Sequence, residues 1–478
     1  METGLSQPGQ DTKNVWLILA GVLFVAVLML FPALWNDYPL IYFDTEDYVE
    51  TSFSWKPILW RIMTYPVFCA IARPFEHLWV VVIAQALIVS WMLHEAVYAF
   101  LPRWRGRVFL VIGVLMATLT GLAIVTSEVL ADVFAGLAIL GIATLALGNP
   151  LPTKRRVVLV ALTILSVGVH MSHVAVGAGL IIVLAVMALL SLRWDAFPRP
   201  RLVAPLIAVA LGTLWVPTTN WLATGKFYIT KAGHVLQMAL FVQDGLAQEY
   251  LEAACPEGAQ LKLCAHKDEL PQTADEFLWG ESPFEELGGW TAMHDEADQV
   301  IAGAIKRFPW DVAKSMARNT WTQLNLISDG EDMVPMTWHF VKTEIKRYPR
   351  DYRKFHYARQ QRQQGIDFEP ANEIHIPVAY AAEIACFGFL VLAWRRRDQV
   401  TLGLIVVVLL AFLGNAFVCG ALSNPHDRYQ NRIVWLALFS SVIAAARMDQ
   451  RHFGQGTAPS ISARAAGPSA DRTDASRS

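Results

Sequence analysis

The chain has 478 residues, of which 54% are hydrophobic and 17% are charged, and its formal net charge is −2. A soluble protein of this length carries about a quarter charged residues, so the composition excludes an ordinary soluble domain. Apolar stretches of about twenty residues, such as 15–34 and 78–93, match a bilayer core of roughly 30 Å. We therefore expect an all-α multi-pass membrane protein with no nucleic-acid partner.

Ten apolar segments follow one another along the chain, and we expect each to be a transmembrane helix: 15–35, 78–100, 108–126, 129–148, 157–170, 174–192, 202–218, 375–394, 400–420 and 432–446. Basic clusters fall on alternate connections, and positive charge marks the cytoplasmic side. An even number of spans then places both termini, 1–14 and 447–478, in the cytoplasm. We expect the tail to be disordered, because from Gly454 onward it has no hydrophobic periodicity. The first segment lacks a small-residue cleavage site, which favours a retained helix over a signal peptide.

Residues 157–192 are almost continuously apolar. As one helix they would be about 54 Å long, too long for a single crossing. Basic clusters at both ends require an even number of crossings, so we expect a tight outer turn at His170-Met171-Ser172-His173. The two short helices either cross the membrane fully or form a re-entrant pair.

Residues 219–374 form one large polar segment between spans 1–7 (15–218) and spans 8–10 (375–446), and the charge pattern places this segment outside. Cys255 and Cys264 lie in it, where an oxidising compartment favours a disulfide worth roughly 2–3 kcal/mol; the alternative is two free thiols. A helix is expected from residue 311 to 324, lying on the membrane or covering a site. Its predicted apolar face holds Val312, Met316, Thr320 and Leu324.

The first outer loop, 36–77, carries three carboxylates in four residues, namely Asp44, Glu46 and Asp47. A carboxylate at the hydrocarbon boundary is costly and commonly acts as a base or metal ligand, whereas a solvated loop needs no such function. Neighbouring aromatic residues can shield a carboxylate from water and raise its pKa toward a value useful for accepting a proton. The sequence leaves these readings open.

Two further polar pairs lie at the outer ends of spans. Glu128 and Asp132 share a helix face, and a charge at Asp132 inside an apolar run costs about 2.5–3.5 kcal/mol. This pair either contributes to a site or fixes helix packing. His170 and His173 also share a face, but no third metal ligand is close in sequence, so we favour hydrogen bonding or contact with an anion.

The last span begins, on the outer side, with a loop that contains His426, Arg428 and Arg432. The two arginines are one helical turn apart and can fork onto a phosphate, because a guanidinium donates several hydrogen bonds in a fixed plane. The alternative is an ion pair with Asp427 or with the acidic loop. Weaker candidates for the same anion are Lys56, Arg61, Lys226, Lys231 and His234.

These features together resemble the GT-C superfamily of membrane glycosyltransferases. The resemblance rests on the acidic pair in the first outer loop, a second acidic position after span 3, the many spans, the outer soluble segment and the closing loop His426-Asp427-Arg428-Tyr429-Gln430, which is similar to that of bacterial members. It implies transfer of a sugar from a polyprenyl-phosphate or polyprenyl-diphosphate carrier, usually with inversion, on the periplasmic side of the bacterial inner membrane. One departure is that the soluble segment lies between spans 7 and 8, whereas many relatives carry theirs after the last span.

The resemblance also implies roles for the candidate residues. Asp44 would be the general base, with Glu46 or Asp47 sharing or replacing it. The phosphate of the lipid donor would lie against His426, Arg428, Arg432 and Arg61. Supporting residues would be Glu128, Asp132, His170 and His173. The family contains metal-dependent and metal-independent members, so we assign no metal and a divalent ion stays open; the acceptor is a glycan, a lipid or a protein.

Two other classes of function are considered. A transporter or flippase for a lipid-linked saccharide would be favoured by charges deep in several spans and by an inverted repeat, neither of which is seen in the sequence. An envelope acyl or phosphoryl transferase would use one of the outer histidines as its base.

Overall fold

The computed structural model describes residues 8–102, 105–336 and 341–455, and every regular element in this part of the chain is a helix. The one extended contact among these residues is an isolated parallel β-bridge between Leu40 and Glu128. The expected all-α architecture is therefore confirmed.

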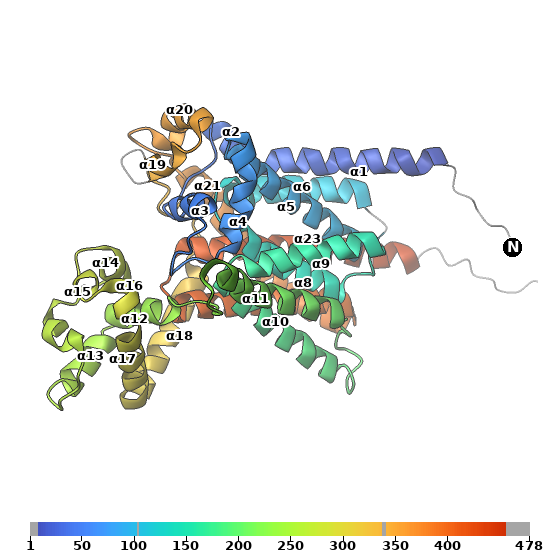
Figure 1. The fold of residues 1–478 in the computed structure, drawn as a ribbon. Helices are drawn as coiled ribbons and strands as arrows, with labels where there is room; N and C mark the ends of the chain where they lie inside the picture. The colour runs from blue at the N-terminus through green and yellow to red at the C-terminus, as the bar shows by residue number, and fades with distance from the viewer. Residues whose placement is uncertain (1–7, 103–104, 337–340, 456–478) are drawn as a thin grey trace, which may run out of the picture.

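The long helices run side by side as a bundle (Figure 1). Among the described residues, six helices are long and apolar enough to cross a membrane. They are α5 (Trp79–Phe100), α10 (Met171–Leu190), α11 (Val203–Thr224), α21 (Glu369–Arg395), α22 (Gln399–Ala416) with its π-helical continuation η4 (Phe417–Ala421), and α23 (Asp427–Gln455). Three of the other four expected spans coincide with helices whose apolar parts are shorter, α1 (Pro8–Met29), α6 (Arg105–Leu119) and α8 (Val133–Leu147), and the fourth coincides with α9 (Thr153–Gly168), which has 16 residues. Helices thus form where the sequence predicts them, but a count of ten membrane crossings is not confirmed.

Helix α8 is surrounded by other helices, and all of its side chains from Val133 to Leu147 are buried. A helix that is apolar on every side is stable only when it is enclosed in this way. Two glycines allow the close approach of its neighbours. A Cβ on Gly136 would lie 2.6 Å from the indole nitrogen of Trp435 on α23, and a Cβ on Gly141 would collide with Thr163 on α9. Small residues commonly serve this purpose at helix contacts in membranes.

The predicted break in 157–192 is confirmed. Helix α9 ends at Gly168 and α10 begins at Met171. His170 has an extended backbone at this point and caps α10, because its ring accepts a hydrogen bond from the backbone N–H of Ser172. The capping bond supplies a partner for one of the N–H groups that every helix start leaves unpaired.

One set of short helices packs on an end of the bundle and shares its hydrophobic core. The set includes α2 (Phe31–Asn36), α3 (Asp44–Ser54), α4 (Thr64–Cys69), η1 (Ala70–Phe75), α7 (Leu122–Ser127), α19 (Val341–Ile345), α20 (Pro349–Tyr357) and η3 (Arg359–Gln361). The hydroxyl of Tyr38 donates to Asp351 at 3.0 Å. The side chain of Gln360 bonds both the N–H and the carbonyl of Ile41, at 3.0 and 2.6 Å. The end of the polar segment is therefore built into the first outer loop.

A second set of helices has a hydrophobic core of its own and forms what we call the outer body, residues 232–325. Its helices are α12 (Gly233–Gln243), α13 (Leu246–Ala254), η2 (Lys262–Glu269), α14 (Ala274–Trp279), α15 (Pro283–Glu286), α16 (Gly289–Ala292), α17 (His294–Arg307) and α18 (Pro309–Asn325). The predicted disulfide between Cys255 and Cys264 is present in it. Residues 219–374 thus divide into this body and the part that packs on the bundle.

Helix α18 confirms the predicted helix but not its buried face. Val312 is buried as expected, but the other buried positions are Ser315, Asn319 and Gln323. Polar residues are buried here because they have partners. Asn319 donates to the carboxylate of Asp244 at 2.6 Å, and Gln323 exchanges two hydrogen bonds with the backbone of His426.

Helix α1 begins and α23 ends at one end of the bundle, opposite the outer body and the short helices around α3 (Figure 1). The tail predicted to be disordered from residue 447 is helical as far as Gln455. Arg447 contributes to this order, because its guanidinium bonds Asp398 at 2.9 Å and the carbonyl of Phe100 at 2.8 Å. The predictions for 1–7 and 456–478 lie outside the described residues.

Candidate functional site

The acidic loop is held against the start of α8 by backbone hydrogen bonds. The N–H of Leu40 donates to Ser127 at 2.9 Å, and the N–H of Val129 donates to Leu40 at 3.0 Å. The hydroxyl of Thr45, next to Asp44, donates to the carbonyl of Val129 at 3.1 Å. This pairing brings the first outer loop beside Glu128.

The Asp44 carboxylate lies between two arginines from distant parts of the chain. Arg61 binds its Oδ1, and Arg428, which is 384 residues away in sequence, donates from Nη1 to its Oδ2 at 3.0 Å. Arg61 also donates from Nε to Asp47 at 2.9 Å, and the indole of Trp60 bonds the same Asp47 oxygen at 2.9 Å. The first loop and the last span therefore meet at one end of the bundle.

The two arginines set the protonation of Asp44. Burial opposes the charged form, but Arg61 and then Arg428 outweigh it and lower the pKa of Asp44 to about 2. A carboxylate with so low a pKa accepts a proton poorly near neutral pH. The geometry thus supports a charge-pairing role for Asp44 more than the role of base that the resemblance implies.

Glu46 lies in a different environment. Burial raises its pKa to about 7, and the neighbouring carboxylates Asp47, Glu344 and Glu50 contribute in the same direction. That pKa suits a general base, but Glu46 does not line the pocket beside Arg428. Of the three acidic residues of the first loop, Asp44 and Asp47 therefore bind Arg61, whereas Glu46 does not.

A narrow pocket opens beside Arg428, with room for about one or two water molecules. Its polar lining comes from four separate regions: Tyr42, Glu128, Asp132, Ser328, Glu331, Arg428 and Asn431. Glu128 is 7% exposed, and its side chain makes no hydrogen bond or ion pair with any residue that the structure describes. Glu128 is thus a carboxyl group that faces the pocket with its oxygens available to a ligand.

Arg432 does not reach the pocket. Its side chain is completely buried, and it donates to Asp132 at 2.6 Å and to the hydroxyl of Ser172 at 3.0 Å. The oxygen of Asn415 and the sulfur of Cys419 lie at 3.4 Å. In this conformation the guanidinium meets protein groups alone, so Arg432 and Asp132 join α23 to the start of α8 instead of presenting charge to a ligand.

The predicted histidines make hydrogen bonds with the protein. His170 contacts the hydroxyl of Ser172 at 2.8 Å, and His173 bonds the carbonyl of Ser166 at 2.8 Å. His426 lies between Glu331, at 2.8 Å, and Asp275 of the outer body, at 3.7 Å. Burial opposes protonation of His426, but the bonds to Asp275 and Glu331 prevail and raise its pKa to about 10.

Glu331, which was not among the residues predicted from the sequence, organises the last loop. One of its oxygens contacts His426, and the other accepts the backbone N–H of Arg428 at 3.0 Å. Arg428 also lies over the rings of Tyr42, at 4.5 Å, and Tyr429, at 4.9 Å, which hold it by cation–π contacts. The available signal was the acidic run 329–332, which has the same density of carboxylates as the first loop.

The first-loop carboxylates do not form a metal site in the described part of the chain, because Asp44 and Asp47 both turn toward Arg61. Comparison of the chain with protein-family models, with curated proteins and with solved structures found no match.

Proposed function

We propose that the chain is a membrane glycosyltransferase that takes a sugar from a polyprenyl-phosphate donor. The observation that carries the proposal is the pair of arginines that share Asp44, one of which, Arg428, lines a pocket that Glu128 also lines. Sugar transfer from a lipid phosphate needs an anion clamp for the leaving phosphate and a base for the attacking hydroxyl. Both kinds of group lie together here, at the end of a bundle of apolar helices.

The clamp would consist of Arg61 and Arg428. Their side chains are 16% and 19% exposed, so each retains surface that a ligand can reach. Arginine binds phosphate through paired N–H groups, and the Asp44 carboxylate occupies the anionic position that a donor phosphate would share or take over. Asp44 would then hold the two guanidinium groups in position while the site is empty and keep their charges from repelling each other.

The base would be Glu128, which replaces Asp44 in the role implied by the resemblance. Burial, together with the charges of Asp132 and Asp329, raises the pKa of Glu128 well above its ordinary value, so its ionised carboxylate binds a proton far more strongly than that of Asp44. Glu128 would take the proton of the acceptor hydroxyl as that oxygen attacks the anomeric carbon. The bond from the anomeric carbon to the phosphate oxygen breaks, and the phosphate leaves with the electron pair against Arg61 and Arg428. Attack from the face opposite the phosphate inverts the anomeric centre. The pocket must widen on binding, because it now has room for water alone.

The direct test is mass spectrometry of envelope glycans and lipid carriers in cells with and without the protein. The proposal expects one sugar to disappear from a glycan while its lipid-linked form accumulates. Glu128→Gln and Arg428→Ala should fail to restore the sugar. Glu249→Gln, an exposed residue of the outer body, should restore it and serves as the matched control.

Two outcomes would contradict the proposal. If the glycan is complete and the lipid-linked sugar only changes leaflet, the chain is a flippase. If Glu128→Gln restores the glycan fully while Asp44→Asn does not, the base is Asp44 and the division of roles given above is wrong.

A further inference from the structure

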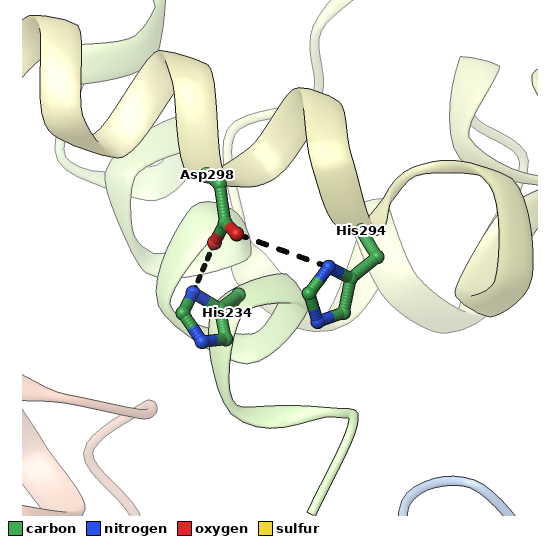
Figure 2. A group of neighbouring side chains, drawn as sticks. All are labelled: His234, His294 and Asp298. Atoms are coloured by element: carbon green, nitrogen blue, oxygen red, sulfur yellow. Dashed lines mark ion pairs between the residues drawn. The ribbon is translucent and has the colours of Figure 1, made fainter.

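A second group of polar side chains lies in the outer body, away from the pocket. His294 and Asp298 are four residues apart on α17 and therefore share a face of that helix. His234 comes from the first turn of α12, which packs against α17. Figure 2 shows the two imidazole rings and the carboxylate turned toward a common point.

The distances join the three side chains into one cluster. His234 Nδ1 contacts Asp298 Oδ1, and His294 Nδ1 lies 3.9 Å from the second oxygen of the same carboxylate. The two imidazole rings are 5.1 Å apart between centres. The ligand atoms of all three residues lie within 4.8 Å of one another, and no other such group of three occurs in the described residues.

Two imidazoles and one carboxylate are the donor set of a three-ligand zinc site. In a tetrahedral site the ligand atoms lie about 3.3 Å apart, because zinc binds nitrogen and oxygen at about 2.0–2.2 Å. The three side chains are between 34% and 55% exposed, so small rotations of their χ angles can close the remaining gap. Their exposure also leaves room for water as the fourth ligand. Magnesium and calcium prefer oxygen ligands and do not match this set.

We propose that His234, His294 and Asp298 bind a zinc ion. This site is separate from the pocket near Arg428, and the inference does not depend on the proposed sugar transfer. His294 Nδ1 also lies 3.5 Å from the exposed carboxylate of Asp295, and rotation of the ring can turn it from that carboxylate toward a metal held by Asp298 and His234. The Oδ1 atom of Asp298 directly contacts Nδ1 of His234, and a zinc ion would replace this contact with two metal bonds.

The position of the site gives the ion a structural effect. Helix α12 is the first helix of the outer body after α11, and α17 leads directly into α18, which packs against η4 of the bundle. A zinc ion would therefore join α12, the first helix of the body, to α17, the helix directly before its last one, α18. The disulfide Cys255–Cys264 closes a loop elsewhere in the same body, so the two crosslinks would act on different helices.

The test uses the full chain in detergent, purified without a polyhistidine tag and stripped with EDTA. Cobalt(II) is the probe, because a four-coordinate cobalt site absorbs strongly in the visible while a six-coordinate one does not. We expect one cobalt ion per chain with the strong visible bands, displaced by one equivalent of zinc. Each of His234→Ala, His294→Ala and Asp298→Ala should weaken binding about a hundredfold or more.

The matched control is His266→Ala, which removes a histidine of the same body that pairs with one carboxylate, Glu269, at 2.8 Å. This variant should bind cobalt as the wild type does. Zinc should raise the unfolding temperature of the wild type and of His266→Ala but not of His234→Ala. The proposal is overturned if bound cobalt shows only the weak spectrum of a six-coordinate ion. It is also overturned if His234→Ala and His266→Ala bind cobalt equally, or if zinc raises the unfolding temperatures of these two variants equally. The three single substitutions are at partly exposed positions, and the disulfide and circular dichroism of each variant report whether it has folded.

Discussion

The ion pair between Asp132 and Arg432 gives the sharpest prediction about stability, because both side chains are buried in the bundle and the test needs no substrate. We consider Asp132→Asn, which keeps the shape of the side chain and removes its charge. Arg432 has no exposed surface, and its remaining close partners, Ser172, Asn415 and the thiol of Cys419, are neutral. The substitution therefore leaves a buried guanidinium without a counter-charge.

Breaking a buried pair in this way costs about 3–5 kcal/mol. The asparagine oxygen can still accept one hydrogen bond from Arg432, so we expect the lower end of that range. At about 2–4 °C for each kcal/mol, the apparent unfolding temperature should fall by roughly 6 °C or more. The measurement is thermal unfolding in detergent, followed by tryptophan fluorescence and by the fraction that stays monodisperse.

The double variant Asp132→Asn with Arg432→Met removes both charges and should recover part of the loss, because no charge is left unpaired. The control is Arg199→Met. It breaks an exposed pair with Asp195, where the two side chains are 66% and 84% exposed, and should leave the unfolding temperature unchanged. A wild-type unfolding temperature for Asp132→Asn would refute the reasoning. The reasoning would also be refuted if the double variant lost as much stability as the two single variants together.

Three further predictions concern the end of the bundle that carries α3 and the outer body. Replacing Cys255 and Cys264 by serine should destabilise the outer body by roughly 2–3 kcal/mol and hasten its proteolysis; equal resistance of both forms would contradict this. The pKa of His426 is raised from 6.5 to about 10, so its stabilising effect is complete below pH 6.5 and is lost as the pH rises toward 10. In His426→Gln, the free energy of unfolding should no longer decrease in this way between pH 6 and 10. If it decreases as in the wild type, the raised pKa of His426 is contradicted. The pKa of Glu46 is raised from 4.5 to about 7, so the folded state binds its proton more tightly and stability falls as the pH rises from about 4.5 to 7. Glu46→Gln should reduce this loss of stability between pH 5 and 8. If the stability of the variant follows the same pH dependence as that of the wild type, the raised pKa of Glu46 is excluded.

Local signals in the sequence predicted local features well. The length and apolarity of segments located the helices, and the excess length of 157–192 located the turn before α10. The two cysteines of a short polar stretch form their disulfide. Each of these features depends on residues close together in the chain, where spacing alone carries the information.

Predictions of buried faces and of side-chain roles were less complete. The apolar pattern of 311–324 suggested a face with Met316, but α18 buries Asn319 and Gln323 because Asp244 and the backbone of His426 supply hydrogen bonds. Hydrophobic periodicity predicts that a polar residue is exposed, because the pattern contains no information about hydrogen-bond partners in other helices. The same limit explains why Glu331 was overlooked.

The amino-acid sequence by itself determined that apolar helices build this protein and that carboxylates and arginines concentrate between them at the same predicted side. The tertiary structure alone decided which charges neutralise each other: Asp44 with Arg61 and Arg428, and Asp132 with Arg432. It also left Glu128 facing the pocket with no ion-pair partner among the described residues. The physical reason is that the strength of a charge interaction depends on separation and burial in three dimensions, and 384 residues of chain separate Asp44 from Arg428.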